Sequence, residues 1–177
     1  MPPKVLRCGR FGRAPTPFVE GAVTTIRHTR GGVIRRVEAE YHALDRAVRA
    51  LSRRGLDRPV PGFGKGARGS REHWTYKDAL AHILFWKQWQ METIAGRPHE
   101  VRPTGRTVHQ ENRWIYEQWH ERPARDVVAW HRRLHREVMG TLRTVGPQVF
   151  ATKHRDQWPH DLVRHSAVHR QRRLEAR

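Results

Sequence analysis

The sequence predicts an all-α protein in which four main helices form a bundle. Apolar residues recur at steps of three and four along several segments, and clusters of glycine and proline separate these segments. No segment alternates apolar and polar residues as a half-buried strand would. A chain of 177 residues is long enough for one domain with its own core. We therefore expect a helical bundle domain over residues 31–177.

Residues 1–30 are expected to form a flexible, basic arm ahead of this domain. The stretch CGRFGRAPTPFVEG is rich in glycine, proline and arginine and has no sustained period. Such a composition is typical of chain that does not pack into a core.

The first two long helices have clear apolar stripes and clear ends. The first ends at Gly55, where a C-terminal cap belongs, and the second begins at Thr75, which forms a capping-box pattern with Asp78. Gly96, followed by arginine and proline, ends the second helix. The stripe of the first helix is Ile34, Val37, Tyr41, Leu44, Val48 and Leu51. The wide apolar face of the second is Leu80, Ile83, Leu84, Trp86 and Met91.

The second half of the chain predicts one short and two longer helices. HQENRWIYEQWHERP is typical of an extra short helix that ends near Arg122. Pro123 suits the first turn of the third long helix, and Pro159 lies near the start of the last one. The core candidates of the third long helix are Val127, Trp130, Leu134, Val138 and Leu142.

The net charge of +18 invites a nucleic-acid interpretation, but its distribution weakens it. Only five of the 35 basic residues are lysines, and the arginines are dispersed along the chain. We expect DNA contact to be non-specific and confined to low salt.

Other features exclude several classes of protein. No apolar run is long enough to span a membrane, and the first residues lack the apolar stretch of a secretory signal. The single cysteine, Cys8, excludes an internal disulfide framework and a cysteine zinc cluster. We expect a cytoplasmic protein without membrane contact.

Histidine is the residue type that offers chemistry, because no phosphate loop, dinucleotide fingerprint or nucleophile elbow is present. The pairs His165/His169 and His131/His135 both have the HxxxH spacing, which places two imidazoles on one helix face. Thirteen histidines would produce about one such pair by chance, so spacing alone does not identify a metal site.

The placement of the histidines separates them further. His165 and His169 continue the stripe begun by Leu162, which suggests an inward direction, whereas His131 and His135 lie among charged residues and are expected to be solvated. His82 has apolar neighbours on both sides, so it is either a metal ligand or a neutral core histidine bonded to a carbonyl. The seven tryptophans likewise either line a pocket for a flat or hydrophobic ligand or fill a core.

Three segments resemble the DinB-like superfamily. WTYKDALAHILFWKQW resembles its second helix, in which a tryptophan and an aspartate precede a histidine, and LVRHSAVHRQRRLE is similar to its closing helix with HxxxH. ENRWIYEQWHERPARDVVAWHRRLHREVMGTL resembles the middle segment of the ClbS/DfsB branch. The resemblance covers residues 32–175 and implies a DinB-like four-helix bundle.

The resemblance also implies a site. In metal-dependent members one histidine of the second helix and two of the last hold a divalent ion, and the matching positions here are His82, His165 and His169. Three imidazoles suit zinc, nickel or iron and leave positions open, as in a catalytic site. The pocket candidates beside it are Trp74, Trp89, Asn112 and Tyr116.

The leading functional hypothesis is a small detoxification or self-protection enzyme. It would act on an electrophilic small molecule by metal-assisted hydrolysis or by transfer of a low-molecular-weight thiol. Two alternatives stay open: a non-enzymatic bundle that sequesters a toxin, and a basic helical bundle associated with DNA. A homodimer is compatible with all three, and the sequence does not decide whether the protein is an enzyme.

Overall fold

The computed structural model describes residues 28–52, 55–60, 72–99, 107–151 and 158–175. Within these ranges the chain is helical and has no strand, as the sequence predicts; one isolated bridge pairs Pro59 with Thr75. Helices α1 (Arg30–Ser52), α2 (Tyr76–Ala95) and α4 (Ala124–Thr144) are long, and α3 (Val108–Trp119) is the expected short helix. Most of the expected arm, residues 1–27, lies outside the described residues.

The last helix runs without a break from Asp161 to Leu174 and is named the C-terminal helix below. It consists of η2 (Asp161–His165), α5 (Ser166–His169) and η3 (Arg170–Leu174), and it follows the short 3₁₀ turn η1 (Pro147–Phe150). Its two outer parts are wide π-turns: the N–H of His165 donates to the carbonyl of His160 at 2.9 Å, five residues back. Such turns are rare and often occur at functional sites.

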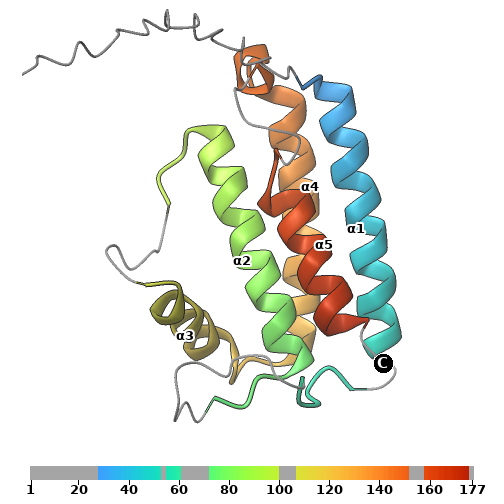
Figure 1. Ribbon diagram of the computed structural model, residues 1–177, viewed down its shortest axis with the longest axis vertical. Coiled ribbons are helices and arrows are strands. Elements are labelled where there is room, and N and C mark those ends of the chain that lie inside the picture. The colour runs from blue at the N-terminus through green and yellow to red at the C-terminus, as the bar shows by residue number, and fades with distance from the viewer. Residues whose placement is uncertain (1–27, 53–54, 61–71, 100–106, 152–157, 176–177) are drawn as a thin grey trace, which may run out of the picture.

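The C-terminal helix lies between two helices: Figure 1 shows it in red between α2 and α1, with α4 behind. The C-terminal helix contacts both α1 and α2, and α4 contacts the same two helices from the other side. α3 lies outside this group and packs against α2. None of the helices in the described ranges has both the length and the apolar character needed to cross a membrane.

The helix ends follow the sequence signals closely. Thr75 and Asp78 form both hydrogen bonds of the capping box, so α2 begins where expected. Gly96 ends α2 in the left-handed conformation with φ 64°, which glycine adopts without steric penalty. Gly55 has φ 97°, and its N–H donates to the carbonyl of Leu51 at 2.9 Å. These caps fix both ends of α2 and the end of α1.

The predicted apolar stripes form the core. All five candidates in α4 are buried, and so are four of the six in α1 and four of the five in α2. Trp86 of α2 is only half-buried, as are Ile34 and Tyr41 of α1. Leu162 and Leu174 bring the C-terminal helix into the same core. Hydrophobic burial therefore accounts for the packing of the long helices.

The core also holds charges that the apolar pattern did not predict. The Glu40 carboxylate of α1 accepts hydrogen bonds from Ser166 Oγ at 2.8 Å and from Arg170 Nε and Nη2 at 3.1 and 3.0 Å. From α2, Lys87 Nζ donates to the carbonyl of Leu162 at 3.1 Å. Buried charges are tolerated when they are paired in this way. They therefore set how the C-terminal helix sits against α1 and α2.

His131 is a correction to the sequence analysis. It was expected to be solvated, but it is 2% exposed, its ring stacks on Tyr41 at 4.9 Å, and its Nε2 lies 3.7 Å from Asp45 Oδ1. His131 follows Val127 by four residues and precedes Leu134 by three, so it belongs to the apolar stripe of α4. His135 is half-buried and also stacks on Tyr41, at 3.5 Å.

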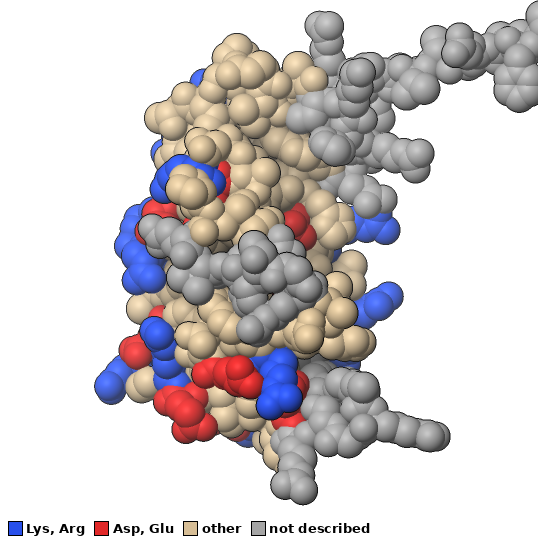
Figure 2. All heavy atoms as spheres, turned by 90° about the vertical axis from the view of Figure 1, so that its left-hand side faces the viewer, with Lys and Arg blue, Asp and Glu red and all other residues tan. Residues whose placement is uncertain are grey.

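Charged side chains are interspersed on the face of the molecule that Figure 2 shows. Lysine and arginine lie beside aspartate and glutamate there, and they do not gather into one positive surface. The dispersion of arginine along the sequence is thus retained on this face.

The Glu40 cluster predicts a large effect on stability. Glu40→Ala should lower the free energy of unfolding by about 3 kcal/mol, because it leaves Ser166 and the buried side of Arg170 without their acceptor. Chemical denaturation followed by circular dichroism measures this.

Glu117→Ala provides the matched control. Glu117 pairs with Arg113 of α3 at 2.8 Å, but their side chains are 51% and 70% exposed, so its loss should change stability by about 0.5 kcal/mol at most. If the two substitutions changed the free energy of unfolding equally, Glu40 would not stabilise the fold more than an exposed carboxylate does.

Candidate metal centre

His82 is the buried member of the candidate site. It lies in the middle of α2, one turn after Asp78 and one turn before Trp86, and is 4% exposed. This position is on the side of α2 that faces the C-terminal helix, since the His82 ring lies 4.7 Å from that of His169. Helical spacing and the packing of α2 therefore fix an imidazole at this contact.

His165 and His169 reach the same place from the C-terminal helix. The residue after each of them, Ser166 and Arg170, is held by Glu40 of α1. Consecutive residues of a helix point about 100° apart. Because Ser166 and Arg170 are held against α1, the residues before them, His165 and His169, point towards α2. The HxxxH spacing keeps both imidazoles on one face.

The three imidazoles form a compact cluster. Their ring centroids are 4.5, 4.7 and 5.3 Å apart, and one nitrogen of each ring lies within 4.8 Å of the others. Zn–N bonds of about 2.1 Å set the nitrogens of a tetrahedral site about 3.4 Å apart. An approach of at most about 1.4 Å, which side-chain rotations can supply, would thus bring the nitrogens to bonding positions. The residues fit a divalent ion that prefers nitrogen ligands.

Burial keeps these histidines neutral, which is the form that binds metal. Desolvation lowers the pKa of His82 well below its usual range, and the neighbouring His169 and His165 add to this effect, while a contact from the Asn112 side chain opposes it. Desolvation also lowers the pKa of His165 to about 3 and that of His169 to about 4. Ligation therefore requires no proton to be displaced at neutral pH.

Asp161 is a carboxylate beside the cluster. Its Oδ1 lies 3.8 Å from Nδ1 of His165 and 3.0 Å from Nδ1 of His160. Gln90 of α2 fixes this end of the helix, because its Oε1 accepts the N–H groups of Asp161 and Leu162 at 2.7 and 2.9 Å. A carboxylate behind a metal-binding histidine commonly fixes the ring orientation. At 3.8 Å Asp161 makes no hydrogen bond to His165, and a small rotation of the two side chains would be needed for it to act in this way.

Three of the four predicted pocket residues lie on the α3 side of the cluster. Trp74 contacts His82 edge-on at 6.1 Å between centroids, and Tyr116 lies against Trp74 at 5.5 Å. Asn112 of α3 reaches His82, as its effect on the pKa of that ring shows. On the other side of His82, Trp86 contacts both His82 and His165 edge-on. Aromatic rings therefore wall the cluster.

Trp89, the fourth pocket candidate, lies elsewhere. Its ring stacks on His99 at 3.2 Å, and it lines a hollow between α2, α3 and α4. The structure therefore does not bring Trp89 to the three histidines, although the seven-residue spacing puts Trp89 and His82 on one face of α2.

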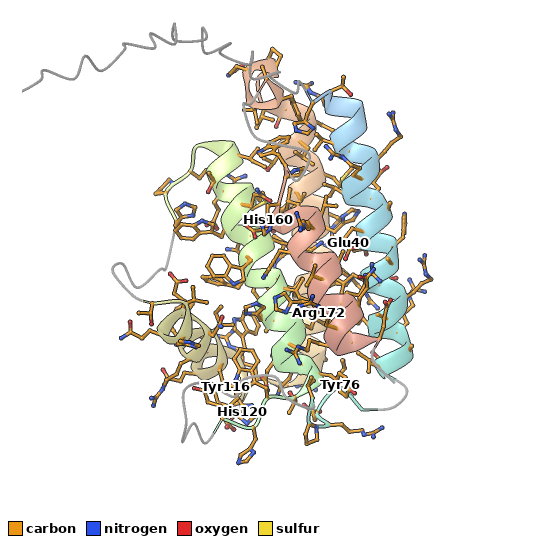
Figure 3. The ribbon with its side chains drawn as sticks, in the orientation of Figure 1. Glu40, Tyr76, Tyr116, His120, His160 and Arg172 are labelled. Carbon is orange, nitrogen blue, oxygen red and sulfur yellow. The ribbon has the colours of Figure 1, made fainter. Side chains whose placement is uncertain are left out.

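One further polar group near the site was missed. His120, just after α3, stacks on Tyr116 at 4.3 Å, and its Nδ1 lies 2.9 Å from Oδ2 of Asp78. Figure 3 shows Tyr116 and His120 together at the end of the molecule where α2 begins. Asp78 thus caps α2, as predicted, and also ties α3 to it. Only its place at the end of the short helix singles out His120 in the sequence.

The lowered pKa values predict that the protein loses stability in acid. The pKa values of His131, His135 and His169 are lowered to about 4 and that of His165 to about 3, mainly by desolvation. Below about pH 6.5 the unfolded chain binds more protons than the folded one, so stability falls as the pH falls towards these values. At about pH 5 we expect a loss on the order of 1 kcal/mol per histidine, measured by thermal melts against pH.

A double variant tests the origin of this acid sensitivity. His165→Asn/His169→Asn should flatten the dependence of the melting temperature on pH, because two of the proton acceptors are removed. A wild-type melting temperature that is flat between about pH 7.5 and pH 5 would contradict the assignment of these histidines as neutral and buried.

Comparisons with family models, curated proteins and solved structures found no match to this chain. The geometry described above is therefore what supports an inference about function.

Proposed function

We propose that His82, His165 and His169 hold one divalent metal ion in a catalytic site. The observation that carries this proposal is that three neutral imidazoles from α2 and the C-terminal helix have nitrogens within 4.8 Å of one another. Three protein ligands leave coordination positions open, which distinguishes catalytic from structural sites. An all-imidazole donor set favours zinc, nickel or iron over magnesium or calcium.

We further propose that the fold is a DinB-like four-helix bundle of the ClbS/DfsB type. The contacts of α1, α4, α2 and the C-terminal helix support this, because each of these helices packs against two of the others in a closed ring. The position of Asn112 and Tyr116 on a short extra helix beside His82 is also compatible with that branch.

The activity that we propose is detoxification or self-protection against an electrophilic small molecule, by hydrolysis or by transfer of a low-molecular-weight thiol. When bound, a divalent ion supplies Lewis-acid activation of water or of a thiol. His82, fixed by burial, and His165, whose Nδ1 lies 3.8 Å from Asp161 Oδ1, would supply donor nitrogens from two helices. Trp74 and Trp86 supply apolar surface beside His82, and Trp86 does so beside His165. The Asn112 amide can donate to or accept from a polar substrate group.

Metal content is the first test of the proposal. Any single alanine substitution among the three histidines should remove most of the metal, because two imidazoles bind far more weakly than three. Elemental analysis of protein without a histidine tag, grown with zinc, nickel and iron, measures this. The fold should survive with a change in stability of about 1–2 kcal/mol.

The second HxxxH pair supplies the control. His135→Gln should leave the metal content unchanged; His131 is a poorer control because it is buried. Because the pKa values of His165 and His169 are lowered, metal should be retained at about pH 6 and be lost only nearer pH 4. Full metal content in a His82→Ala/His165→Ala variant, or no metal in the wild type, would refute the site.

Turnover is the second test. Metal-loaded wild-type protein should consume a small electrophile such as an epoxide, with water or with an added low-molecular-weight thiol, and mass spectrometry follows the product. His82→Asn should lower this rate at least about hundredfold, since activation requires the ion. Asp161→Asn should lower metal affinity about tenfold, if the His165 ring turns to donate to this carboxylate when the ion binds.

Trp158→Phe is the matched control for turnover, because Trp158 packs on Phe150 and His28 and contacts none of the three histidines. Its rate should equal that of the wild type. A metal-loaded protein that turns over no electrophile under either condition would leave the metal site standing and reject the proposed reaction.

A further inference from the structure

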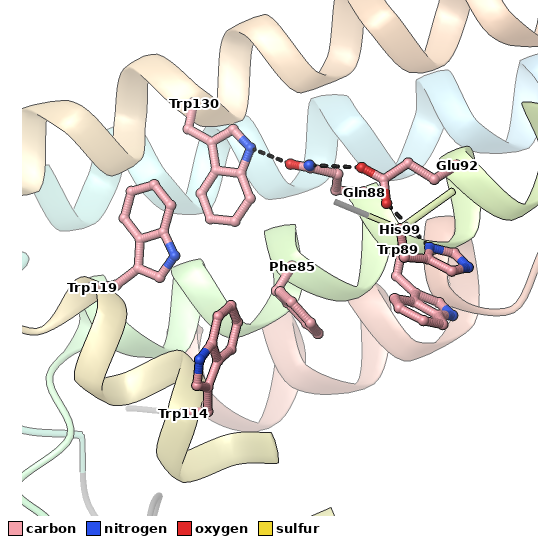
Figure 4. A pocket seen from close by; sticks show the side chains of 8 residues that line it. All are labelled: Phe85, Gln88, Trp89, Glu92, His99, Trp114, Trp119 and Trp130. Atoms are coloured by element: carbon pink, nitrogen blue, oxygen red, sulfur yellow. Dashed lines mark hydrogen bonds and ion pairs between the residues drawn. The ribbon is translucent and has the colours of Figure 1, made fainter. Parts of the chain in front are cut away.

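A second site lies on the other side of α2. A hollow of about 140 Å³ lies where α2, α3 and α4 meet, and Figure 4 shows the side chains around it. A cavity of about 150 Å³ accepts benzene, so this one has room for a small ring or a methylated ammonium group. Its aromatic lining consists of Phe85, Trp89, Trp114, Trp119 and Trp130.

The aromatic rings pack against one another around the hollow. Trp119 and Trp130 stack on each other at 4.3 Å with planes 6° apart, which holds one side of the hollow. Phe85 and Trp114 meet edge-to-face at 5.6 Å and 61°, an arrangement in which the two rings do not stack face to face. Aromatic faces attract cations through the quadrupole of the ring.

A buried carboxylate completes the wall. The Glu92 side chain is 10% exposed; its Oε1 accepts from Gln88 Nε2 at 2.8 Å and its Oε2 lies 3.1 Å from His99 Nδ1. Trp130 donates in turn to Gln88 Oε1 at 3.1 Å, so the position of Glu92 is fixed by a chain of contacts (Figure 4). A carboxylate has about four acceptor positions, and these contacts use two of them.

The charge of the hollow is opposite to that of the protein. The chain has 35 lysines and arginines and a net charge of +18, yet the described residues that line the hollow include neither lysine nor arginine. Glu92 is the one carboxylate among them. Arg122, which is not among these lining residues, lies over the ring of Trp119 at 4.6 Å. A carboxylate beside aromatic rings is complementary to an organic cation.

We propose that this hollow binds a small organic cation with a methylated ammonium group. The methyl groups lie against Phe85 and Trp114, and the positive charge lies beside Glu92. The site is separate from the three histidines and does not depend on a metal there.

Tryptophan fluorescence and calorimetry with tetramethylammonium chloride test this assignment, with sodium chloride as the ionic-strength control. We expect saturable quenching with a dissociation constant on the order of 1 mM. Tert-butyl alcohol, which has a similar shape but no charge, should bind at least about tenfold more weakly. Equal affinity for the two compounds, or no saturable signal from tetramethylammonium, would overturn the proposal.

Variants locate the binding. Glu92→Gln keeps the side-chain shape and should weaken tetramethylammonium about tenfold while leaving the alcohol unchanged. Trp114→Ala should weaken both ligands, and Trp158→Phe, away from the hollow, neither. Undiminished binding by folded Glu92→Gln would remove the role of the carboxylate; if that variant does not fold, the comparison of the two compounds in the wild type still decides.

Discussion

The hydrogen bonds of Glu40 to the C-terminal helix are the contact on which the candidate metal centre depends. Glu40 holds Ser166 and Arg170, and these residues directly follow His165 and His169 in sequence. Because Ser166 and Arg170 face α1, His165 and His169 face α2, where His82 lies. Figure 3 shows Glu40 on α1 beside the C-terminal helix. Apolar packing brings the helices together, but this polar contact specifies their rotation.

Burial gives the cluster its chemical character. A neutral imidazole is cheap to bury compared with an imidazolium, so desolvation alone makes protonation unfavourable for His82, His165 and His169. The same desolvation that prepares nitrogen donors for a metal also makes the folded state vulnerable to acid. Lys87, whose pKa burial lowers to about 8, shows that the contact between α2 and the C-terminal helix disfavours positive charge generally.

Much of the fold follows from local signals, and the rest depends on which faces meet. The capping box of Thr75 and Asp78, and Gly96 beyond the end of α2, act within a few residues, so the sequence predicts them well. Glu40 and Lys87 have apolar residues three and four positions away, so both lie on the buried faces of their helices. Their burial was not expected, because charged side chains are normally exposed. His131 shows the same error: its charged sequence neighbours concealed its place on the stripe of α4. Periodicity also places Trp89 on the same face of α2 as His82, but the two lie about 10 Å apart along the helix, and Trp89 lines the hollow with α3 and α4.

Both proposed sites would bind a positively charged ligand, although the protein itself has a net charge of +18. Long-range repulsion from dispersed arginines is screened within about 8–10 Å at physiological salt, whereas contacts with buried groups are screened much less. At one site the local groups are neutral nitrogen donors, and at the other they are aromatic rings beside Glu92. Both lie along α2, where adjacent residues Phe85 and Trp86 face the hollow and the histidines respectively. Local composition along this one helix, and not the charge of the whole chain, therefore determines which ligands the interior can hold.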